Sequence, residues 1–207
     1  MSRTENADDT FANLGVRRAT TEDLDGLTAT LTAAFANDPV WSWAFPDQQG
    51  LAAWGRLLIG SALRYRWVWT IDDYAAAAVW IPPGGVELTE EEAAQVEPML
   101  DDLIGPRAGE ILDLVERFDA NHPAEPAHYY LSLLGTHPSH RGKGLGMALL
   151  ARNLETIDAE GFPAYLESTN AANNKRYEGQ GFRQVGSFSR PDGQVTITTM
   201  WRDPQTP

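Results

Sequence analysis

The residues whose types and spacing best suit chemistry lie in the run H-Y-Y-L-S-L-L-G-T-H-P-S-H-R-G-K-G-L-G-M, where a strand-like stretch leads into a glycine-rich turn. Gly142, Gly144 and Gly146 lack a Cβ, so they can adopt positive φ and let main-chain amides approach a ligand closely. A helix is predicted to follow, and the unpaired amides of a helix N-terminus favour phosphate. Arg141 and Lys143 add positive charge. This run therefore predicts a binding site for an anionic ligand.

Three kinds of phosphate-binding turn are distinguished by their spacing. A Walker loop requires Ser or Thr directly after its lysine, whereas Gly144 follows Lys143. A dinucleotide-binding turn counted from Gly142 requires a third glycine where this chain has Met147. The remaining pattern is R-x-x-G-x-G, which begins at Arg141 and follows a strand that ends in T-H-P.

The R-x-x-G-x-G pattern resembles the pyrophosphate-binding turn of the GNAT superfamily of N-acetyltransferases, and other parts of the chain extend the likeness. The next strand of that family, its asparagine- and tyrosine-bearing helix and its terminal G-F are similar to residues 164–182, A-Y-L-E-S-T-N-A-A-N-N-K-R-Y-E-G-Q-G-F. Its opening strand and helix are similar to residues 16–24, V-R-R-A-T-T-E-D-L. The likeness spans residues 16 to 202.

This resemblance implies acetyl-coenzyme A as the cosubstrate. In the family, the backbone of the fourth strand runs along the pantetheine arm, and an amide at its end polarises the thioester carbonyl. Gly135 also allows a β-bulge that would open the gap occupied by the cofactor. Asn170 and Asn173 both match family asparagines that contact coenzyme A, depending on the branch compared. The residues predicted to bind the cofactor are Leu134, Gly135, Thr136, Arg141, Gly142, Lys143, Gly144, Leu145, Gly146, Met147, Asn170 and Asn173.

Amide formation from a thioester requires a neutral amine close to the acyl carbon, stabilisation of the oxyanion and a proton for the departing thiolate. Tyr177 matches the family tyrosine that faces the sulfur, so the resemblance implies that it protonates the thiolate or donates a hydrogen bond to it. Asp38, Glu167 and His128 are three candidates for the general base, because each can accept a proton directly or through water. The histidines have no spacing typical of a metal ligand set, so no metal is expected.

The elements predicted around these residues give an α/β fold. Helices are predicted from Thr20 to about Phe35, near 51–66, 89–103 and 107–119, and from the glycine turn to Gly161. Apolar runs at 67–71 with 74–81, and at 182–189 with 195–201, are predicted to form two hairpins. The strands before and after the crossover helix are expected to be parallel. We therefore expect a mixed, mostly antiparallel twisted sheet flanked by helices, and the resemblance implies a splayed central parallel pair.

The amino-acid composition of the chain narrows the classes of molecule that it is expected to bind. The 207 residues include 16 Lys and Arg against 29 Asp and Glu, a net charge of −13, which argues against nucleic acid or an anionic membrane and favours an amine-bearing substrate. The chain has no cysteine and no apolar run long enough to span a bilayer, so a cytoplasmic location is expected. Residues 15–203 are predicted to form a single N-acetyltransferase domain, with a flexible segment at 1–14 and a tail at 204–207.

Together, these observations predict an N-acetyltransferase that transfers an acetyl group from acetyl-coenzyme A to a primary amine of a small molecule, by direct attack in a ternary complex. The expected acceptor is an antibiotic-like or aminoacyl-like metabolite, and the expected assembly is a monomer or a homodimer. Two alternatives stay open. One is acetylation of a peptide or protein amine, and the other is a non-catalytic sensor that binds an acyl-coenzyme A.

Overall fold

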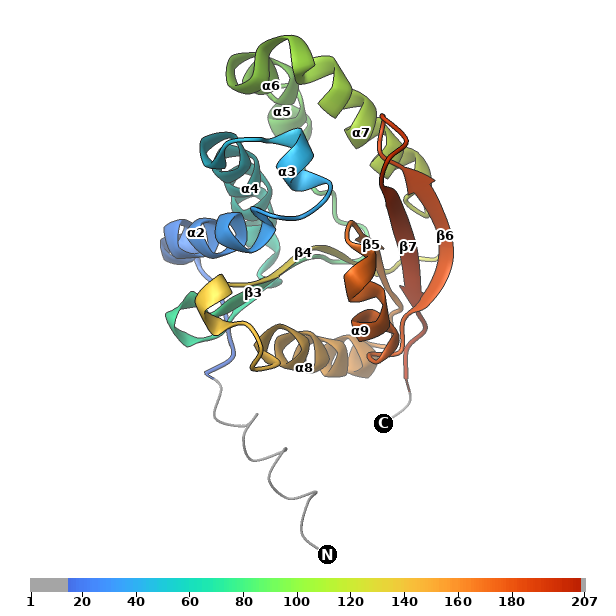
Figure 1. The fold of residues 1–207 in the computed structure, drawn as a ribbon. Coiled ribbons are helices and arrows are strands. Elements are labelled where there is room, and N and C mark those ends of the chain that lie inside the picture. The colour runs from blue at the N-terminus through green and yellow to red at the C-terminus, as the bar shows by residue number, and fades with distance from the viewer. Residues whose placement is uncertain (1–14, 206–207) are drawn as a thin grey trace, which may run out of the picture.

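The computed structural model describes residues 15–205, so the predicted flexible segment 1–14 and the last two residues of the predicted tail lie outside the described residues. A seven-stranded sheet forms the centre of the molecule, in the order β1-β2-β3-β4-β5-β7-β6 (Figure 1). The strands are β1 Arg17–Arg18, β2 Val68–Thr70, β3 Ala76–Ile81, β4 Tyr129–Thr136, β5 Ala164–Ser168, β6 Arg183–Ser189 and β7 Thr196–Arg202. The α-helices are α2 Leu24–Phe35, α3 Trp41–Ala44, α4 Gln48–Ala62, α5 Glu90–Ala93, α6 Val96–Ile104, α7 Ala108–Asn121, α8 Leu145–Glu160 and α9 Asn174–Glu178.

The strand directions confirm the predicted mixed sheet. The pair β4 and β5 is parallel, with α8 as the crossover between them, and the five other neighbouring pairs are antiparallel. Both predicted hairpins are present, as β2 with β3 and β6 with β7. The strand β7 lies between β5 and β6, so the last hairpin joins the sheet through its second strand.

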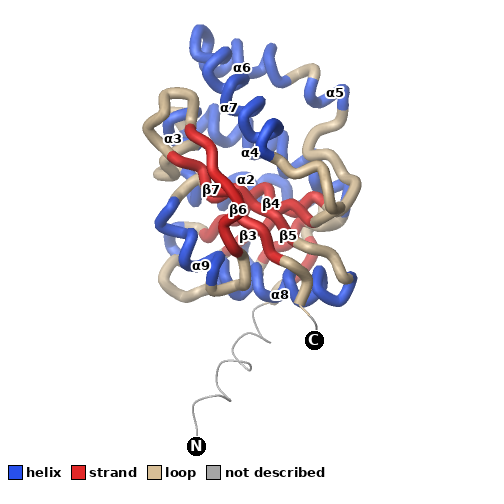
Figure 2. Tube along the Cα trace, turned by 90° about the vertical axis from the view of Figure 1, so that its right-hand side faces the viewer, coloured by secondary structure: helices blue, strands red, loops and turns tan. Residues whose placement is uncertain are grey.

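Helices cover both faces of this sheet (Figure 2). On one face, α8 buries Leu149, Leu150, Leu154 and Ile157, which recur at helical spacing. Gly161 ends this helix in the left-handed conformation, as predicted. The other face is covered by α2 and α4, with α6 and α7 farther out, and their apolar side chains pack together in a second core.

The parallel pair separates soon after it forms. Only three residues of β4, from Tyr129 to Leu131, pair with β5, and the rest of β4 continues without a partner on that side. On its other side, β4 shifts register against β3: Val79 pairs with Leu133, but Trp80 pairs with Leu131. Ser132 is therefore the extra residue of a β-bulge. The splayed pair expected from the resemblance is present, and it leaves an open strand edge.

The predicted bulge at Gly135 is wrong, because Gly135 pairs regularly with Ala77. The structure gives this glycine a different role. A Cβ built on Gly135 would lie 2.7 Å from Leu31 Cδ2 and 2.8 Å from the Ala34 Cβ. Glycine is thus required because α2 crosses β4 too closely for any side chain.

Candidate active site

A cavity of about 850 Å³ opens where β4 and β5 separate, on the face covered by α2 and α4. Leu134 of β4 and Leu166 of β5 line it from the sheet, and α3, α4 and α7 supply an apolar wall that includes Trp41, Trp54 and Phe118. The sequence-predicted site residues that reach this cavity are Asp38, His128, Leu134, Glu167, Asn173 and Tyr177. The structure thus brings the three base candidates and the predicted thiolate partner to one space.

The glycine turn lies at the N-terminus of α8, beyond the open edge of β4. Gly142 and Gly144 have φ of 79° and 75°, and Gly144 is the N-cap residue of the helix, without a side-chain cap. Ala148 N donates to Gly144 O at 2.9 Å, so the amides of Leu145, Gly146 and Met147 are the unpaired donors of the first turn. This geometry presents main-chain donors and a positive helix end to an anion.

Two predicted cofactor residues of this region, Gly146 and Arg141, have clear structural contacts. Gly146 adopts helical rather than left-handed geometry, and a Cβ on it would lie 2.6 Å from Thr136 Oγ1, so glycine lets the helix start pack on β4. Arg141 Nη2 donates to Ala34 O at 2.7 Å, near the C-terminal end of α2. Lys143 is exposed. The Arg141 guanidinium therefore joins the glycine turn to α2 in this structure.

The two candidate asparagines differ in their surroundings. Asn170 Oδ1 accepts a hydrogen bond from Ala172 N at 3.1 Å, which places this side chain in a local turn. Asn173 lines the cavity, and its Oδ1 accepts from Arg176 Nη1 at 2.8 Å. The geometry therefore favours Asn173 as the asparagine that meets a bound ligand.

Tyr177 comes from α9 and lies against the cavity, with its ring packed edge-on against Phe182. Desolvation raises the pKa of Tyr177 to about 12, and the nearby Asp38 carboxylate contributes to the increase. A phenol with this pKa stays protonated at neutral pH, so the Tyr177 hydroxyl at the cavity can act as a hydrogen-bond donor.

Asp38 is held at the start of α3 by a set of hydrogen bonds. Its Oδ1 accepts from Val40 N at 2.9 Å and from Trp41 N at 3.2 Å, and its Oδ2 accepts from Thr169 Oγ1 at 2.8 Å. The residue is 8% exposed, and burial raises the pKa of its carboxyl above the ordinary value. A carboxylate of raised basicity next to Tyr177 is suited to accept a proton.

Glu167 faces the cavity from β5 and lies near His122, which is in turn paired with His128. His128 Nδ1 lies 2.8 Å from Pro126 O, so Nδ1 carries a proton. Burial lowers the pKa of His128, which leaves its Nε2 free to accept from His122 Nε2 at 3.1 Å. His122 Nδ1 lies 3.6 Å from Glu167 Oε1. When His122 is protonated, its positive charge attracts the Glu167 carboxylate.

Glu87, in the loop after β3, completes the acidic side of the cavity. Its carboxylate accepts a hydrogen bond from Ser132 Oγ, on the bulge of β4. Burial raises the pKa of Glu87 to about 7, and the carboxylates of Glu167 and Asp119 add to the increase, whereas His122 opposes it. Neither Glu87 nor His122 is among the site residues predicted from the sequence.

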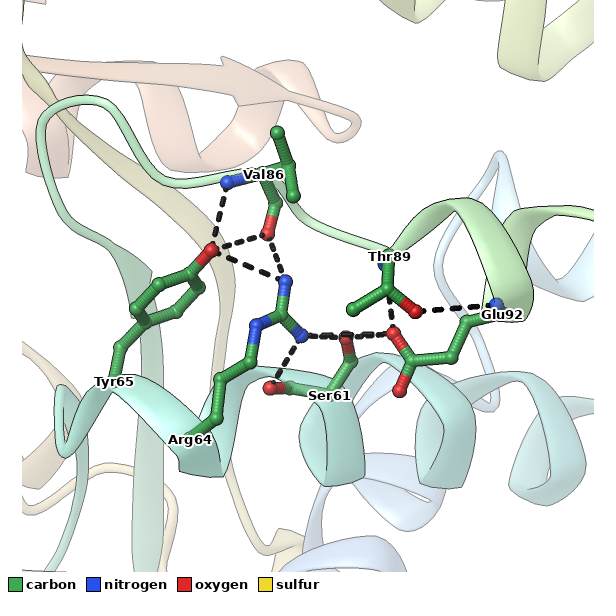
Figure 3. Close-up of polar contacts among 6 residues, drawn as sticks. All are labelled: Ser61, Arg64, Tyr65, Val86, Thr89 and Glu92. Carbon is green, nitrogen blue, oxygen red and sulfur yellow. Dashed lines mark hydrogen bonds and ion pairs between the residues drawn. The ribbon is translucent and has the colours of Figure 1, made fainter.

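The loop that carries Glu87 is fixed on both sides of this residue (Figure 3). Arg64 Nη2 donates to Val86 O at 2.5 Å, and Val86 N donates to Tyr65 Oη at 2.9 Å. After Glu87, the capping box of α5 holds the chain, because Thr89 N donates to Glu92 Oε2 at 2.8 Å and Ser61 Oγ donates to the same oxygen at 2.5 Å. The Glu87 backbone therefore has little freedom to move away from the cavity.

Replacing Glu87 with glutamine is expected to stabilise the ligand-free protein at pH 8 by up to about 3 kcal/mol, and to change its stability little at pH 4. The folded pKa near 7 lies above the ordinary value of 4.5, so wild-type stability falls as the pH rises through this range. Urea unfolding at both pH values measures the difference. The control is Glu91→Gln, which changes an exposed glutamate on α5. If both variants changed the free energy of unfolding equally at pH 8, the charge of Glu87 would not be buried as the structure indicates.

The residues that sequence reasoning missed lack local patterns. Glu87 is an isolated glutamate after a Pro-Pro-Gly-Gly break, and Ser132 is an ordinary strand residue. His122 begins a short proline-containing loop that ends at the base candidate His128, and this is the one signal that could have marked His122. Among the described residues, no group of three or more His, Asp or Glu side chains is placed to hold a metal ion. No helix within residues 15–205 is long and apolar enough to cross a membrane.

Comparison with known proteins gives one family and many similar folds. The sequence pattern of the acetyltransferase (GNAT) family matches residues 39–182. A Schizosaccharomyces pombe protein described as an uncharacterized N-acetyltransferase is 24% identical over 209 residues, which cover 93% of this chain and 85% of that protein.

Solved structures share the fold over nearly the whole chain. The Corynebacterium glutamicum protein described as histone acetyltransferase HPA2 and related acetyltransferase is 24% identical, with a TM-score of 0.63 over 93% of this chain and 97% of that one. Arylalkylamine N-acetyltransferase 2 from Aedes aegypti is 15% identical, with a TM-score of 0.69 over 93% and 100%. An agmatine N-acetyltransferase is 16% identical, with a TM-score of 0.67 over 91% and 98%.

Proposed function

The chain belongs to the acetyltransferase (GNAT) family, and from this premise we propose that it transfers the acetyl group of acetyl-coenzyme A to a primary amine of a small molecule. Enzymes of this family generally use acetyl-coenzyme A. The observation that carries the proposal is the open edge of β4, which leads from the unpaired amides of α8 to a cavity containing Asp38 and Tyr177.

The described residues fit the cosubstrate in two places. The unpaired amides at the start of α8 suit its pyrophosphate, with Lys143 beside them and the turn anchored through Arg141. The unpartnered part of β4 offers main-chain groups to the pantetheine arm, in the manner of an added strand. In this proposal, Leu134 and Asn173 contact the arm from the cavity, and Gly135 and Thr136 continue along the strand.

The proposed mechanism is direct attack within a ternary complex. The acceptor ammonium gives one proton to the Asp38 carboxylate, and its neutral nitrogen then bonds to the carbonyl carbon of the thioester as the C=O π pair moves onto the oxygen. The carbonyl re-forms as the carbon–sulfur bond breaks, the sulfur leaves with the bonding electron pair as a thiolate, and the second nitrogen proton passes to solvent. Tyr177 donates a hydrogen bond to this thiolate. Because the tyrosine pKa is about 12 and a thiol pKa is about 8.5, full proton donation by Tyr177 would be uphill by about 5 kcal/mol.

Glu167 is the alternative general base, because the histidine pair could carry its proton away from the cavity. Asp38 is the preferred general base because it lies near the proposed thiolate partner: its charge contributes to the raised pKa of Tyr177. Its carboxylate is also held in place by the Thr169 hydroxyl, just beyond the end of β5. The two assignments make opposite predictions for Asp38→Asn and Glu167→Gln, as developed in the Discussion.

The proposed acceptor is an antibiotic-like or aminoacyl-like amine. The order of the motifs A-F-A-N-D-P at 34–39 and H-P-A-E-P-A-H-Y-Y-L at 122–131 is similar to puromycin N-acetyltransferase. Two of the structural relatives are named for agmatine and arylalkylamine acetylation, so amines of several shapes fit this fold. The acidic cavity supports an acceptor that arrives as a cation.

A thiol-release assay with acetyl-coenzyme A and a panel of small amines tests the function. We expect thiol release with at least one small amine and none without an acceptor. Release with peptide amines alone would instead support the peptide acetyltransferase. If calorimetry detects coenzyme A binding but no amine or peptide releases thiol, the chain is a sensor and the proposed activity is wrong.

A further inference from the structure

The cavity has an unusual charge balance. Six carboxylate side chains line it, whereas no lysine or arginine of the described residues does so. These acidic residues are Asp38, Glu87, Glu97, Asp119, Glu125 and Glu167. Carboxylates gathered in a space of low dielectric repel one another, so a cation in the cavity would lower the free energy of the site.

Glu167 gives the most direct indication of such a cation. Its side chain is 2% exposed, and neither carboxylate oxygen accepts a hydrogen bond of regular geometry among the described residues, although the carboxylate is near enough to the Tyr130 and Tyr165 hydroxyls to raise the pKa of both. A buried carboxylate without hydrogen bonds is costly, and natural proteins rarely keep one. The nearest positive group is His122, whose Nδ1 lies 3.6 Å from Glu167 Oε1 and provides charge only when protonated. The Glu167 carboxylate therefore has no permanent positive partner, and a cationic ligand could supply one.

Glu87 faces the same space from the other side of β4, and its position is set by the protein. Ser132 on the bulge binds its carboxylate, and the contacts in Figure 3 hold Val86 and Thr89 on either side of it. Burial raises the pKa of Glu87, and the charge of Glu167 adds to the increase. Glu87 and Glu167 thus line one cavity, and the repulsion between their carboxylates would be relieved by a cation bound there.

This carboxylate pair is displaced from the reacting end of the cavity. Asp38 binds Thr169, which lies two residues after Glu167 and beyond the end of β5. Two residues of extended chain correspond to about 7 Å. An acceptor whose reacting amine lies at Asp38 would therefore need a second positive group, joined by a spacer, to reach Glu87 and Glu167. The apolar wall formed by Trp41 and Phe118 suits such a spacer.

We propose that Glu87 and Glu167 form a cation subsite, and that the acceptor is an aliphatic amine with a second cationic group, a diamine or a guanidino-amine. This inference rests on the proposed acetyl transfer, and it replaces the broader antibiotic-like or aminoacyl-like acceptor with an amine that carries two positive groups. Glu167 is then a binding residue, and Asp38 is the base.

The test compares 1,4-diaminobutane with butylamine, which has the same carbon chain and one charge fewer. We expect kcat/KM for the diamine to exceed that for the monoamine by about 10- to 100-fold, the range that a charge-assisted hydrogen bond supports. Glu87→Gln should reduce this ratio towards one, mainly through a higher KM for the diamine. The matched control is Glu91→Gln, which removes the same charge outside the cavity and should keep the ratio.

The possible outcomes separate the two proposals. If butylamine is acetylated as well as the diamine, the subsite is wrong, while the acetyl transfer stands. If Glu167→Gln lowers kcat for both amines equally and leaves KM unchanged, Glu167 is the base, and the subsite is also wrong. If no amine releases thiol, the proposed function fails. Calorimetry with 1,4-diaminobutane then tests the subsite alone, where binding that Glu87→Gln weakens supports it and no binding overturns it.

Discussion

Asp38→Asn is expected to lower kcat/KM for the acceptor amine by about 100- to 10,000-fold, the usual contribution of a general base. Asparagine keeps the oxygen that accepts from Val40 N and Trp41 N, and its amide can donate to the Thr169 hydroxyl, so the local fold should persist. The residual activity should rise about tenfold per pH unit, because the variant depends on the neutral fraction of the free amine. Steady-state thiol release from pH 6 to pH 9 measures both effects.

The wild-type protein should show a shallower dependence on pH over the same range. Burial raises the pKa of Asp38, so the acidic limb of its profile should lie above the ordinary aspartate range. The matched control is Asp47→Asn, which changes another capping aspartate, at the start of α4 and outside the cavity. Wild-type turnover in Asp38→Asn together with a large loss in Glu167→Gln would transfer the base role to Glu167.

Tyr177→Phe is expected to lower kcat by about 100-fold, as for the loss of a hydrogen-bond donor that stabilises charge in a transition state. The Tyr177 pKa of about 12 keeps the phenol protonated at working pH, so the variant loses a hydrogen bond to the leaving thiolate. The KM for the acceptor should change little, because the hydroxyl acts on the sulfur. Kinetics with acetyl-coenzyme A and an activated thioester of lower thiol pKa measure the effect.

The leaving group provides the decisive comparison. A thiolate of lower basicity needs less stabilisation, so the activated thioester should lose much less rate in Tyr177→Phe than acetyl-coenzyme A does. Tyr74→Phe is the control, because it removes a hydroxyl that donates to Asp23 at 2.9 Å, away from the cavity. Equal losses with both thioesters would show that Tyr177 does not act on the sulfur.

The glycine turn and the elements next to it were predictable because their determinants are local. Gly142 and Gly144 adopt the positive φ that their lack of a side chain allows, and Gly161 ends α8 where the apolar pattern stops. The two hairpins are joined within a few residues, so their pairing also follows from short-range patterns. The order of β7 between β5 and β6 did not follow, because register across the sheet depends on contacts distant in sequence.

The role of Gly135 shows where local reasoning fails. The sequence allowed a bulge there, but the bulge is at Ser132, and the glycine is required by α2, about one hundred residues earlier in the chain. The position of a bulge and the need for a glycine both depend on which elements pack against the strand. The residues next to Gly135 in the sequence do not carry that information.

The sequence by itself determined the glycine turn at the start of α8, the α/β architecture, and the residues proposed for acetyl transfer, because each depends on spacing within one or two elements. Only the tertiary structure decided how these residues meet. Glu87, Glu167 and His122 come from three separate segments, and their charges act on one another because α7 and the loop after β3 pack over the separated strands. Such coupling depends on the distances between the charges and on the dielectric around them, both of which are set by three-dimensional packing, so a linear pattern does not encode it.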